Sequence, residues 1–228
     1  MADRVITLKG ATKRFFKKGK FDLTPLDNVN FSVKRGERIA IWGESGIGKT
    51  TLLNVIGLLS SQTSGDYYLN GRNVKTFSEN KKAHLRNSYF GYIIQDFALV
   101  ENWTVYNNLK LPLKNRDKKP KNSKELIRES LAEIGLESKI GVEARHLSVG
   151  ERQRIAIARA LINSPEVILA DEPTASLDAK NKDTVIEMFD KICTGDKTIL
   201  IATHDDEVLK FVNTVYRIAD GKLFIEGR

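Results

Sequence analysis

One eight-residue segment, GESGIGKT at 43–50, constrains this chain more than any other part of it. It fits the pattern G-x-x-x-x-G-K-[ST], in which a glycine-rich backbone turns tightly and points its N–H groups at phosphate oxygens. The apolar run RIAIW at 38–42 precedes it and predicts a buried strand, whereas KTTLLNVIGLLS at 49–60 follows it with the spacing of a helix. A strand, a glycine-rich turn and a helix in this order predict a nucleotide-binding α/β fold.

Individual positions of this segment have separate predicted roles. The three glycines allow the turn, Lys49 supplies a positive charge for the β- and γ-phosphates, and Thr50 supplies a hydroxyl for Mg²⁺. We expect the nucleotide to be held by Gly43, Glu44, Ser45, Gly46, Ile47, Gly48, Lys49, Thr50 and Thr51.

A pair of carboxylates follows a second apolar strand. In VILADEP at 167–173, four apolar residues predict a strand buried on both faces, and Asp171 and Glu172 fall at its C-terminal end. Open α/β sheets bind ligands at that edge. Asp171 is therefore predicted to hold Mg²⁺ through water, and Glu172 to polarise the attacking water as a general base. Taken alone, Asp-Glu-Pro after a strand is equally typical of an ordinary loop.

The segment LSVGERQRIAIARAL at 147–161 predicts a helix with a second anion site at its start. Ser148 and Glu151 have the spacing of a capping box, which by itself indicates only a well-started helix. The same helix N-terminus, with the Ser148 hydroxyl and the N–H of Gly150, also suits an anion. One nucleotide does not need two such sites from one chain, which suggests a partner subunit.

Three single residues complete the candidate set. Gln95 is predicted to end a strand, from which it could reach both Mg²⁺ and the attacking water. His204 follows the apolar run TILIAT at 198–203 and could contact the γ-phosphate. Phe15 precedes the strand that leads into the phosphate loop and could stack on an adenine, worth roughly 1–3 kcal/mol. Each of them, in isolation, is also typical of a structural residue.

Composition narrows the remaining function classes. No window approaches the roughly 18 consecutive apolar residues that a membrane-spanning helix requires, and the start MADRVITLKG has no apolar signal core. The one cysteine, Cys193, excludes an internal disulfide, so we expect an intracellular protein of a reducing compartment. The net charge of +8 would suit nucleic acid, an anionic membrane surface or merely a solvated surface. Its densest basic stretch, KNRDKKPKNSK at 114–124, predicts an exposed loop.

The rest of the chain alternates between strand and helix patterns. Strands are predicted at RVITL, VNFSV (29–33), a hairpin GDYYLNGRNV around Asn70-Gly71, FGYIIQ (90–95) and TVYRIAD-G-KLFIE; helical patterns cover about 97–160 and 179–193. Strands that alternate with helices imply a mostly parallel sheet.

Six motifs in this order resemble the ATP-binding subunit of ABC transporters, and the resemblance covers essentially the whole chain. They are Walker A (GESGIGKT), the Q-loop Gln95, the signature LSVGE, Walker B (VILADE), the D-loop SLD at 176–178 and the switch His204. The stretches FGYIIQDFALVENWTVYNNLKLPL and ERQRIAIARALINSPEVILADEPTASLD look most like the lipoprotein-release and macrolide-export branch.

The resemblance implies a fold and an assembly. The fold would be a P-loop NTPase of the ABC type over 1–228, with a mostly parallel core sheet, an N-terminal antiparallel β part and an inserted helical subdomain at about 97–160. Two copies would pair head to tail around two ATP molecules with Mg²⁺. Each copy would dock under an integral-membrane permease subunit through residues 95–105, peripherally on the cytoplasmic side of the inner membrane.

The resemblance also assigns residues to this assembly. Ser148, Gly150 and Glu151 would act on the partner's ATP, and Asp178 would link the two sites. Glu172, His204 and Gln95 would be catalytic, and Thr50, Gln95 and Asp171 would hold the metal. The implied cargo is a peptide, a lipoprotein or a drug.

Two positions depart from the family pattern, and two other functions stay open. Val149 replaces the first glycine of the usual signature LSGGQ or LSGGE, and Phe15 lacks the hydroxyl of the usual tyrosine. If a glycine is needed there for a positive φ or for close backbone approach, valine weakens the site that acts on the partner's ATP. If Val149 is an ordinary first-turn residue of the helix, which the intact capping box favours, it costs only a few tenths of a kcal/mol. The alternatives are a soluble ABC-type ATPase acting on nucleic acid or ribosomes, although no nucleic-acid partner is expected, and an envelope ATPase that transmits force without moving substrate.

Overall fold

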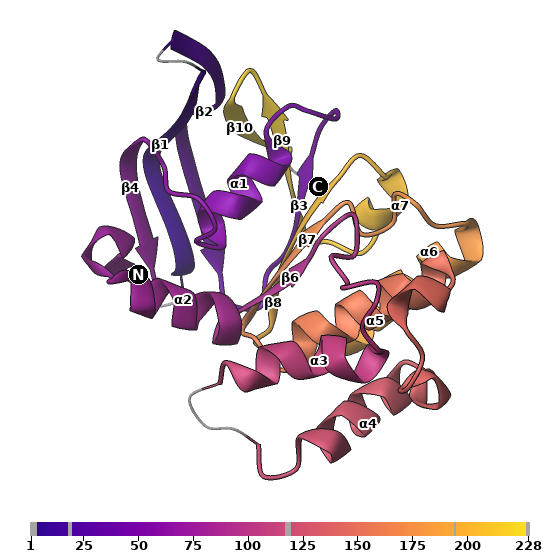
Figure 1. Cartoon of the computed structure of the whole chain (residues 1–228). Helices are drawn as coiled ribbons and strands as arrows, with labels where there is room; N and C mark the ends of the chain where they lie inside the picture. The colour runs from indigo at the N-terminus through magenta and orange to yellow at the C-terminus, as the bar shows by residue number, and fades with distance from the viewer. Residues whose placement is uncertain (1–3, 18–19, 117–119, 194, 227–228) are drawn as a thin grey trace.

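Two β-sheets organise the chain in a computed structural model, which describes residues 4–17, 20–116, 120–193 and 195–226 (Figure 1). The antiparallel sheet contains β1 (Arg4–Lys17), β2 (Lys20–Lys34), β4 (Ser64–Leu69) and β5 (Arg72–Asn73), in the order β2-β1-β4-β5. The second sheet contains β3 (Arg38–Trp42), β6 (Phe90–Ile93), β7 (Val167–Asp171), β8 (Thr198–Thr203), β9 (Thr214–Ala219) and β10 (Lys222–Glu226), in the order β10-β9-β3-β8-β7-β6. All neighbours in this second sheet pair in parallel except β10, which pairs antiparallel with β9.

Seven α-helices connect and cover the strands in the described part of the chain. They are α1 (Lys49–Ile56), α2 (Glu79–Ser88), α3 (Val105–Lys114), α4 (Ser123–Glu133), α5 (Val149–Leu161), α6 (Ala179–Ile192) and α7 (Asp206–Leu209). Within the described residues, each helix is too short or too polar to span a bilayer.

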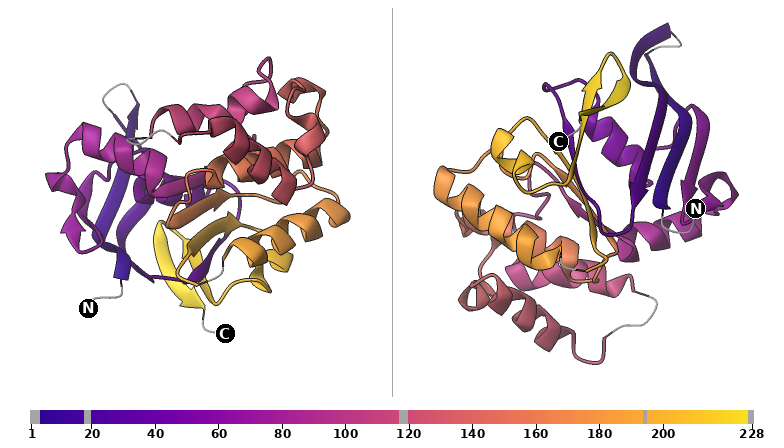
Figure 2. Two further views of the ribbon diagram at one scale, coloured as in Figure 1. Left: turned by 90° about the horizontal axis from the view of Figure 1, so that it is seen from below. Right: turned by 180° about the vertical axis from the view of Figure 1, so that it is seen from behind.

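The central parallel strands are apolar on both faces, and each face packs against different elements. In one cluster, Leu169 and Leu200 of the sheet pack with α1 and with the antiparallel sheet. In a second cluster, Ile168 and Ile201, one residue along, pack with α6. Successive side chains of a strand point to opposite faces, so α1 lies between the two sheets and α6 lies on the other side. Figures 1 and 2 show this layering.

A third apolar cluster joins α3, α4 and α5, which lie between β6 and β7 in the sequence. It contains buried side chains such as Leu109, Leu131 and Ile155. Ile157, on another side of α5, belongs instead to the cluster under the parallel sheet. Because α5 contributes to both clusters, it connects this helical segment to the sheet.

The predicted fold class is confirmed, but several element boundaries differ from the sequence patterns. The two N-terminal strands are far longer than RVITL and VNFSV, because irregularities such as the shift between Leu8 and Ala11 interrupt the alternation. The predicted hairpin at Asn70-Gly71 is present, with both residues at positive φ. The predicted loop 114–124 is shorter, since Lys114 ends α3 and Ser123 begins α4; its residues 117–119 lie outside the described residues.

Candidate active site

The phosphate loop connects the C-terminal end of β3 to the first turn of α1. Two of its glycines have backbone angles that disfavour other residues, with φ of +79° at Gly46 and +121° at Gly48. A Cβ on Gly48 would also lie 2.5 Å from the Pro25 carbonyl oxygen, closer than atoms can approach. The backbone of this loop therefore depends on the glycine spacing of the motif.

Lys49 lies inside the loop, with 5% of its side chain exposed. Its ammonium donates hydrogen bonds to the carbonyl oxygens of Gly43 and Glu44, at 2.6 and 3.0 Å. It also lies 3.0 Å from a carboxylate oxygen of Glu172, whose side chain is only 10% exposed. A buried ion pair therefore joins the phosphate loop to the end of β7.

Asp171 is the last residue of β7, and one of its carboxylate oxygens, Oδ1, is buried without a hydrogen-bond partner among the described residues. Burial raises the pKa of this carboxyl, the negative charge of Glu172 adds to the rise, and a hydrogen bond donated by the Thr50 side chain opposes it. A buried, unpartnered carboxylate oxygen beside a threonine hydroxyl is the donor set that Mg²⁺ prefers. The residues present thus fit the expected metal.

Glu172, directly after β7, interacts with the phosphate loop, with β8 and with His204 after β8. It has a left-handed backbone, with φ of +47°, and its N–H donates to the Ala202 carbonyl on β8 at 2.9 Å. Its carboxylate lies between Lys49 and His204, whose Nδ1 is 3.0 Å away. Non-glycine residues in this conformation cost about 1–2 kcal/mol, and such strain clusters at functional sites.

Two expected residues are exposed, and within the described residues neither forms a hydrogen bond or ion pair with the phosphate loop. Gln95 does not end a strand, because β6 stops at Ile93 and Gln95 lies in the following exposed turn, where Phe97 and Ala98 have positive φ. Phe15 lies on β1 with 43% of its surface exposed, and the Lys13 ammonium lies 5.1 Å from its ring centroid.

The signature segment begins α5 with the expected capping box. The Ser148 hydroxyl accepts from the Glu151 N–H at 3.3 Å, and the Glu151 carboxylate accepts from the Ser148 N–H at 2.8 Å. The bond from the Ser148 N–H, with a smaller contribution from Lys139, lowers the pKa of Glu151 against the opposing effect of burial. Val149 is the first helical residue, has no positive φ and is 39% exposed. A glycine is therefore not required there for backbone conformation.

The D-loop residue Asp178 caps α6, and a residue that the sequence analysis missed holds its side chain. Asn181 donates from its backbone N–H to Asp178 Oδ1 at 2.9 Å and from Nδ2 to both carboxylate oxygens at 3.0 Å. These bonds lower the pKa of Asp178. A Cβ on Gly150 would lie 2.3 Å from Asn181 Oδ1, so the D-loop helix packs directly on the signature. The Asp-x-x-Asn spacing of a helix cap was the available signal.

Gln153 and Arg159 of α5 were also missed, and no pattern in the sequence marks them. Gln153 is buried and donates from Nε2 to the Pro173 carbonyl, directly after Glu172, at 2.8 Å. Arg159 donates to the carbonyl oxygens of Phe97 and Ala98 in the turn after Gln95. The signature helix is thereby connected to both the Walker B end and the Q-loop turn.

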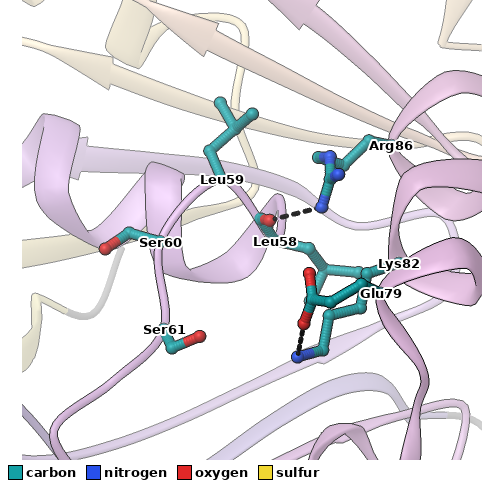
Figure 3. A pocket seen from close by; sticks show the side chains of 7 residues that line it. All are labelled: Leu58, Leu59, Ser60, Ser61, Glu79, Lys82 and Arg86. Carbon is teal, nitrogen blue, oxygen red and sulfur yellow. Dashed lines mark hydrogen bonds and ion pairs between the residues drawn. The ribbon is translucent and has the colours of Figure 1, made fainter.

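A separate pocket of about 360 Å³ lies beside the C-terminal end of α1 (Figure 3). It is lined by Leu58, Leu59, Ser60, Ser61, Glu79, Lys82 and Arg86. Residues 58–61 follow the C-terminal end of α1, whereas the phosphate loop lies at its N-terminal end. Arg86 donates to the Leu58 carbonyl at 3.1 Å and Lys82 pairs with Glu79 at 2.8 Å, so the basic groups of this cavity already have partners.

The chain resembles known proteins over nearly its whole length. The lipoprotein-releasing system ATP-binding protein LolD of Francisella tularensis is 39% identical over 225 residues, which are 98% of this chain and 97% of that protein. The macrolide export ATP-binding/permease protein MacB of Vibrio parahaemolyticus is 37% identical over 226 residues, 99% of this chain but only 34% of that longer protein.

Solved structures agree with this relationship. A dimeric structure of the ATP-binding cassette MJ0796 in a post-hydrolysis state, bound to ADP and Pi, superposes with a TM-score of 0.90. The two share 32% identity over 97% of this chain and 98% of that one. The sequence profile of the ABC transporter family matches residues 26–175. The chain therefore belongs to the ABC transporter family, as an ATP-binding cassette with ATPase activity related to LolD and MacB.

Proposed function

We propose that the chain is the ATP-hydrolysing subunit of a membrane transporter and works as a head-to-tail homodimer. One observation carries the proposal: the two anion-binding features of the chain belong to different parts of the fold. The phosphate loop precedes α1, which packs between the sheets, whereas the signature begins α5, which packs with α3, α4 and the far face of the parallel sheet. A second copy, turned around, brings one chain's signature to the other chain's phosphate loop.

Lys49 and Glu172 form a buried ion pair and neutralise each other. An arriving triphosphate carries several negative charges and competes for the Lys49 ammonium, so Glu172 is released from its ion pair. Glu172 then accepts a proton from the attacking water. His204, whose Nδ1 lies 3.0 Å from the Glu172 carboxylate, orients that carboxylate and contacts the γ-phosphate. Nucleotide binding and activation of the base are thus coupled.

The metal belongs to the same proposal. Thr50, Asp171 and Gln95 would hold Mg²⁺, which when bound neutralises charge on the β- and γ-phosphates. Gln95 would reach the site from the turn after β6, and the remaining phosphate-loop residues, 43–51, would surround the phosphates with N–H groups. Phe15, exposed on β1, would stack on the adenine.

Residues at the signature and D-loop would complete the partner's site. Ser148, Gly150 and Glu151 would bind the partner's γ-phosphate with the N-terminal end of α5, and Asp178 would contact the partner's phosphate loop. The whole chain, 1–228, would then act as one nucleotide-binding domain, with residues 97–160 as its helical subdomain.

The membrane partners and cargo follow from the relatives. LolD is named for lipoprotein release and MacB for macrolide export. We therefore propose integral-membrane permease subunits that receive force through residues 95–105, a location on the cytoplasmic side of the membrane, and a lipoprotein, peptide or drug as cargo.

The solution mass of Glu172→Gln, measured by light scattering with and without Mg-ATP, tests the dimer. The substitution keeps the shape of the side chain but removes the general base, which should lower the rate of hydrolysis by about 10²–10⁴-fold. We expect a monomer without nucleotide and a dimer with ATP. Ser148→Ala in the same background should weaken that dimer. A chain that binds ATP but stays monomeric, with or without its permease, would contradict the proposed assembly.

Val149→Gly should change little. Because Val149 is an exposed, ordinary first-turn residue of α5, glycine there should lower stability by no more than about 0.5 kcal/mol and leave the ATP-dependent dimer intact. The ATP concentration that half-saturates dimer formation is the measurement. A tenfold improvement with glycine would show that valine obstructs the contact with the partner's nucleotide.

Cell fractionation distinguishes the transporter from a soluble ATPase. We expect the full chain to sediment with membranes in cells that contain the proposed permease and to be released when the permease is absent. Sedimentation with ribosomes or DNA instead would overturn the transporter assignment, although the ATPase assignment would stand.

A further inference from the structure

One carboxylate outside the proposed active site joins three of its elements. Asp205, directly after His204, accepts from the Lys182 ammonium at 2.7 Å and from the Thr174 hydroxyl at 3.1 Å, both at Oδ2. Its other oxygen accepts from the Glu207 N–H at 3.1 Å. Thr174 is fully buried two residues after Glu172, and Lys182 lies on the first turns of α6. One side chain thus ties the switch loop to the Walker B loop and to the D-loop helix.

The position of the Asp205 carboxylate influences where the His204 imidazole lies. The imidazole is 58% exposed, and among the described residues its hydrogen-bond and ion-pair partner is Glu172. Its side chain therefore has little packing of its own, and its placement depends on the backbone on either side. On one side Thr203 is buried in β8; on the other, Asp205 is fixed by side-chain bonds.

Lys182 is the group that makes this attachment strong. The ion pair is partly buried, with side-chain exposures of 30% for Lys182 and 14% for Asp205, so water screens it less than an exposed pair. Burial opposes ionisation of Asp205, but the bonds from Lys182, the Glu207 N–H and Thr174 together lower its pKa, so the carboxylate stays charged near neutral pH. The residue beside it, Asn181, holds Asp178 and packs on Gly150.

We infer that Lys182 is a positioning residue for ATP hydrolysis: by holding Asp205 it fixes the switch loop so that His204 stays against Glu172. The inference rests on the proposed catalytic roles of His204 and Glu172. Lys182 touches neither the nucleotide site nor the reacting atoms, so it should affect the rate of the chemical step and not the binding of ATP. The first turns of α6 also contact the D-loop and the signature through Asn181. The N-terminal end of α6 therefore connects the proposed dimer surface with His204 and Glu172 of the same chain.

Lys182→Met tests the inference in the full chain. We expect kcat for ATP hydrolysis to fall about tenfold, because small displacements of a catalytic group have effects of this size, while KM for ATP changes less than twofold. Lys182→Arg, which can still reach the carboxylate, should restore most of the rate. ATP-dependent dimerisation in the Glu172→Gln background should be unchanged by Lys182→Met.

Lys210→Met is the matched control. Lys210 pairs with Glu207 at 2.6 Å on α7, the helix that follows the switch loop, but this pair is exposed, at 73% and 58%, and does not involve the Asp205 side chain. The control should keep the wild-type kcat, and both variants should show cooperative thermal unfolding. An unchanged kcat in Lys182→Met, or a loss that Lys182→Arg does not restore, overturns the inference. If the wild-type chain does not hydrolyse ATP, or if Glu172→Gln hydrolyses it normally, the proposed function itself fails, and the two failures are therefore distinguishable.

Discussion

Lys49→Met is expected to weaken ATP binding and also to destabilise the nucleotide-free chain. The first effect follows from the loss of a positive charge at the phosphate loop: a charge-assisted hydrogen bond is worth about 1.5–3 kcal/mol, or roughly 10–100-fold in affinity. The second effect follows from the structure, because Lys49 and Glu172 are both nearly buried and lie 3.0 Å apart. Removing the lysine leaves a buried carboxylate without its main counter-charge.

The size of the second effect separates this variant from an ordinary loss of binding. Breaking a buried ion pair from one side costs about 3 kcal/mol, a large fraction of a domain's stability. Replacing both partners removes the unpaired charge, so Lys49→Met combined with Glu172→Gln should be more stable than Lys49→Met alone. The four unfolding free energies, measured by denaturant titration without nucleotide, give the coupling energy between the two residues.

Two outcomes would contradict this account. If Lys49→Met unfolds at the same denaturant concentration as the wild type, the ion pair contributes nothing and Glu172 is not held by the lysine. If the double variant is no more stable than Lys49→Met, the destabilisation comes from the loss of the hydrogen bonds to Gly43 and Glu44 instead. Lys75→Met, which breaks an exposed lysine–carboxylate pair with Asp66 in the antiparallel part of the chain, serves as the control and should alter neither quantity appreciably.

The sequence predicted those parts of the fold whose chemistry is local. The phosphate loop needs glycines at fixed positions, and Gly48, with its positive φ and the close Pro25 carbonyl, shows why their spacing carries so much information. The buried strands β7 and β8 were predicted from continuous apolar runs, because both faces of a parallel strand are covered. The capping box of α5 depends on two side chains three residues apart, so it too could be read directly.

Features that depend on distant segments could not be predicted in the same way. The Lys49–Glu172 pair joins residues more than one hundred positions apart, and the sequence around either residue does not predict the pairing. Gln153 donates to the Pro173 carbonyl in the loop after β7, but a glutamine within a helix is unremarkable in a sequence. The boundary of β6 was misplaced because the apolar run continues to Ile94, whereas pairing with β7 ends at Ile93. The hydrophobicity of a segment does not predict where its backbone pairing with a neighbouring strand ends.

Asp171→Asn is expected to have opposite effects on stability and activity. Burial and the nearby charge of Glu172 raise the pKa of the Asp171 carboxyl, so folding favours its protonated form. The stability associated with this group is therefore present at low pH and is lost as the pH rises through the pKa of the folded state. Above that pKa the ionised, buried carboxylate lowers the stability of the chain when no nucleotide is bound. Asparagine has nearly the same shape without the charge, so the variant should unfold at higher temperature than the wild type.

The pH dependence of that stability difference tests its cause. The advantage of Asp171→Asn should be largest at pH values above the carboxyl's pKa and should shrink as acidification protonates Asp171 in the wild type. Asp183→Asn, an exposed carboxylate on α6, is a suitable control and should show no such gain. A variant that is less stable than the wild type at neutral pH would show that the Thr50 hydrogen bond and the charge of Lys49, which both favour the ionised carboxylate, outweigh burial at this site.

The ATPase activity of Asp171→Asn should fall although its stability rises, because the same buried carboxylate is the proposed ligand for Mg²⁺. Without it, hydrolysis should fall at least about 100-fold, which corresponds to about 2.7 kcal/mol of lost transition-state stabilisation. Mg-ATP should raise the unfolding temperature of the wild type but not that of Asp171→Asn. If the variant is stabilised by Mg-ATP as much as the wild type, Asp171 does not hold the metal. We therefore expect the buried Asp171 carboxylate to lower the stability of the chain without nucleotide, and to be required for Mg²⁺ binding and ATP hydrolysis.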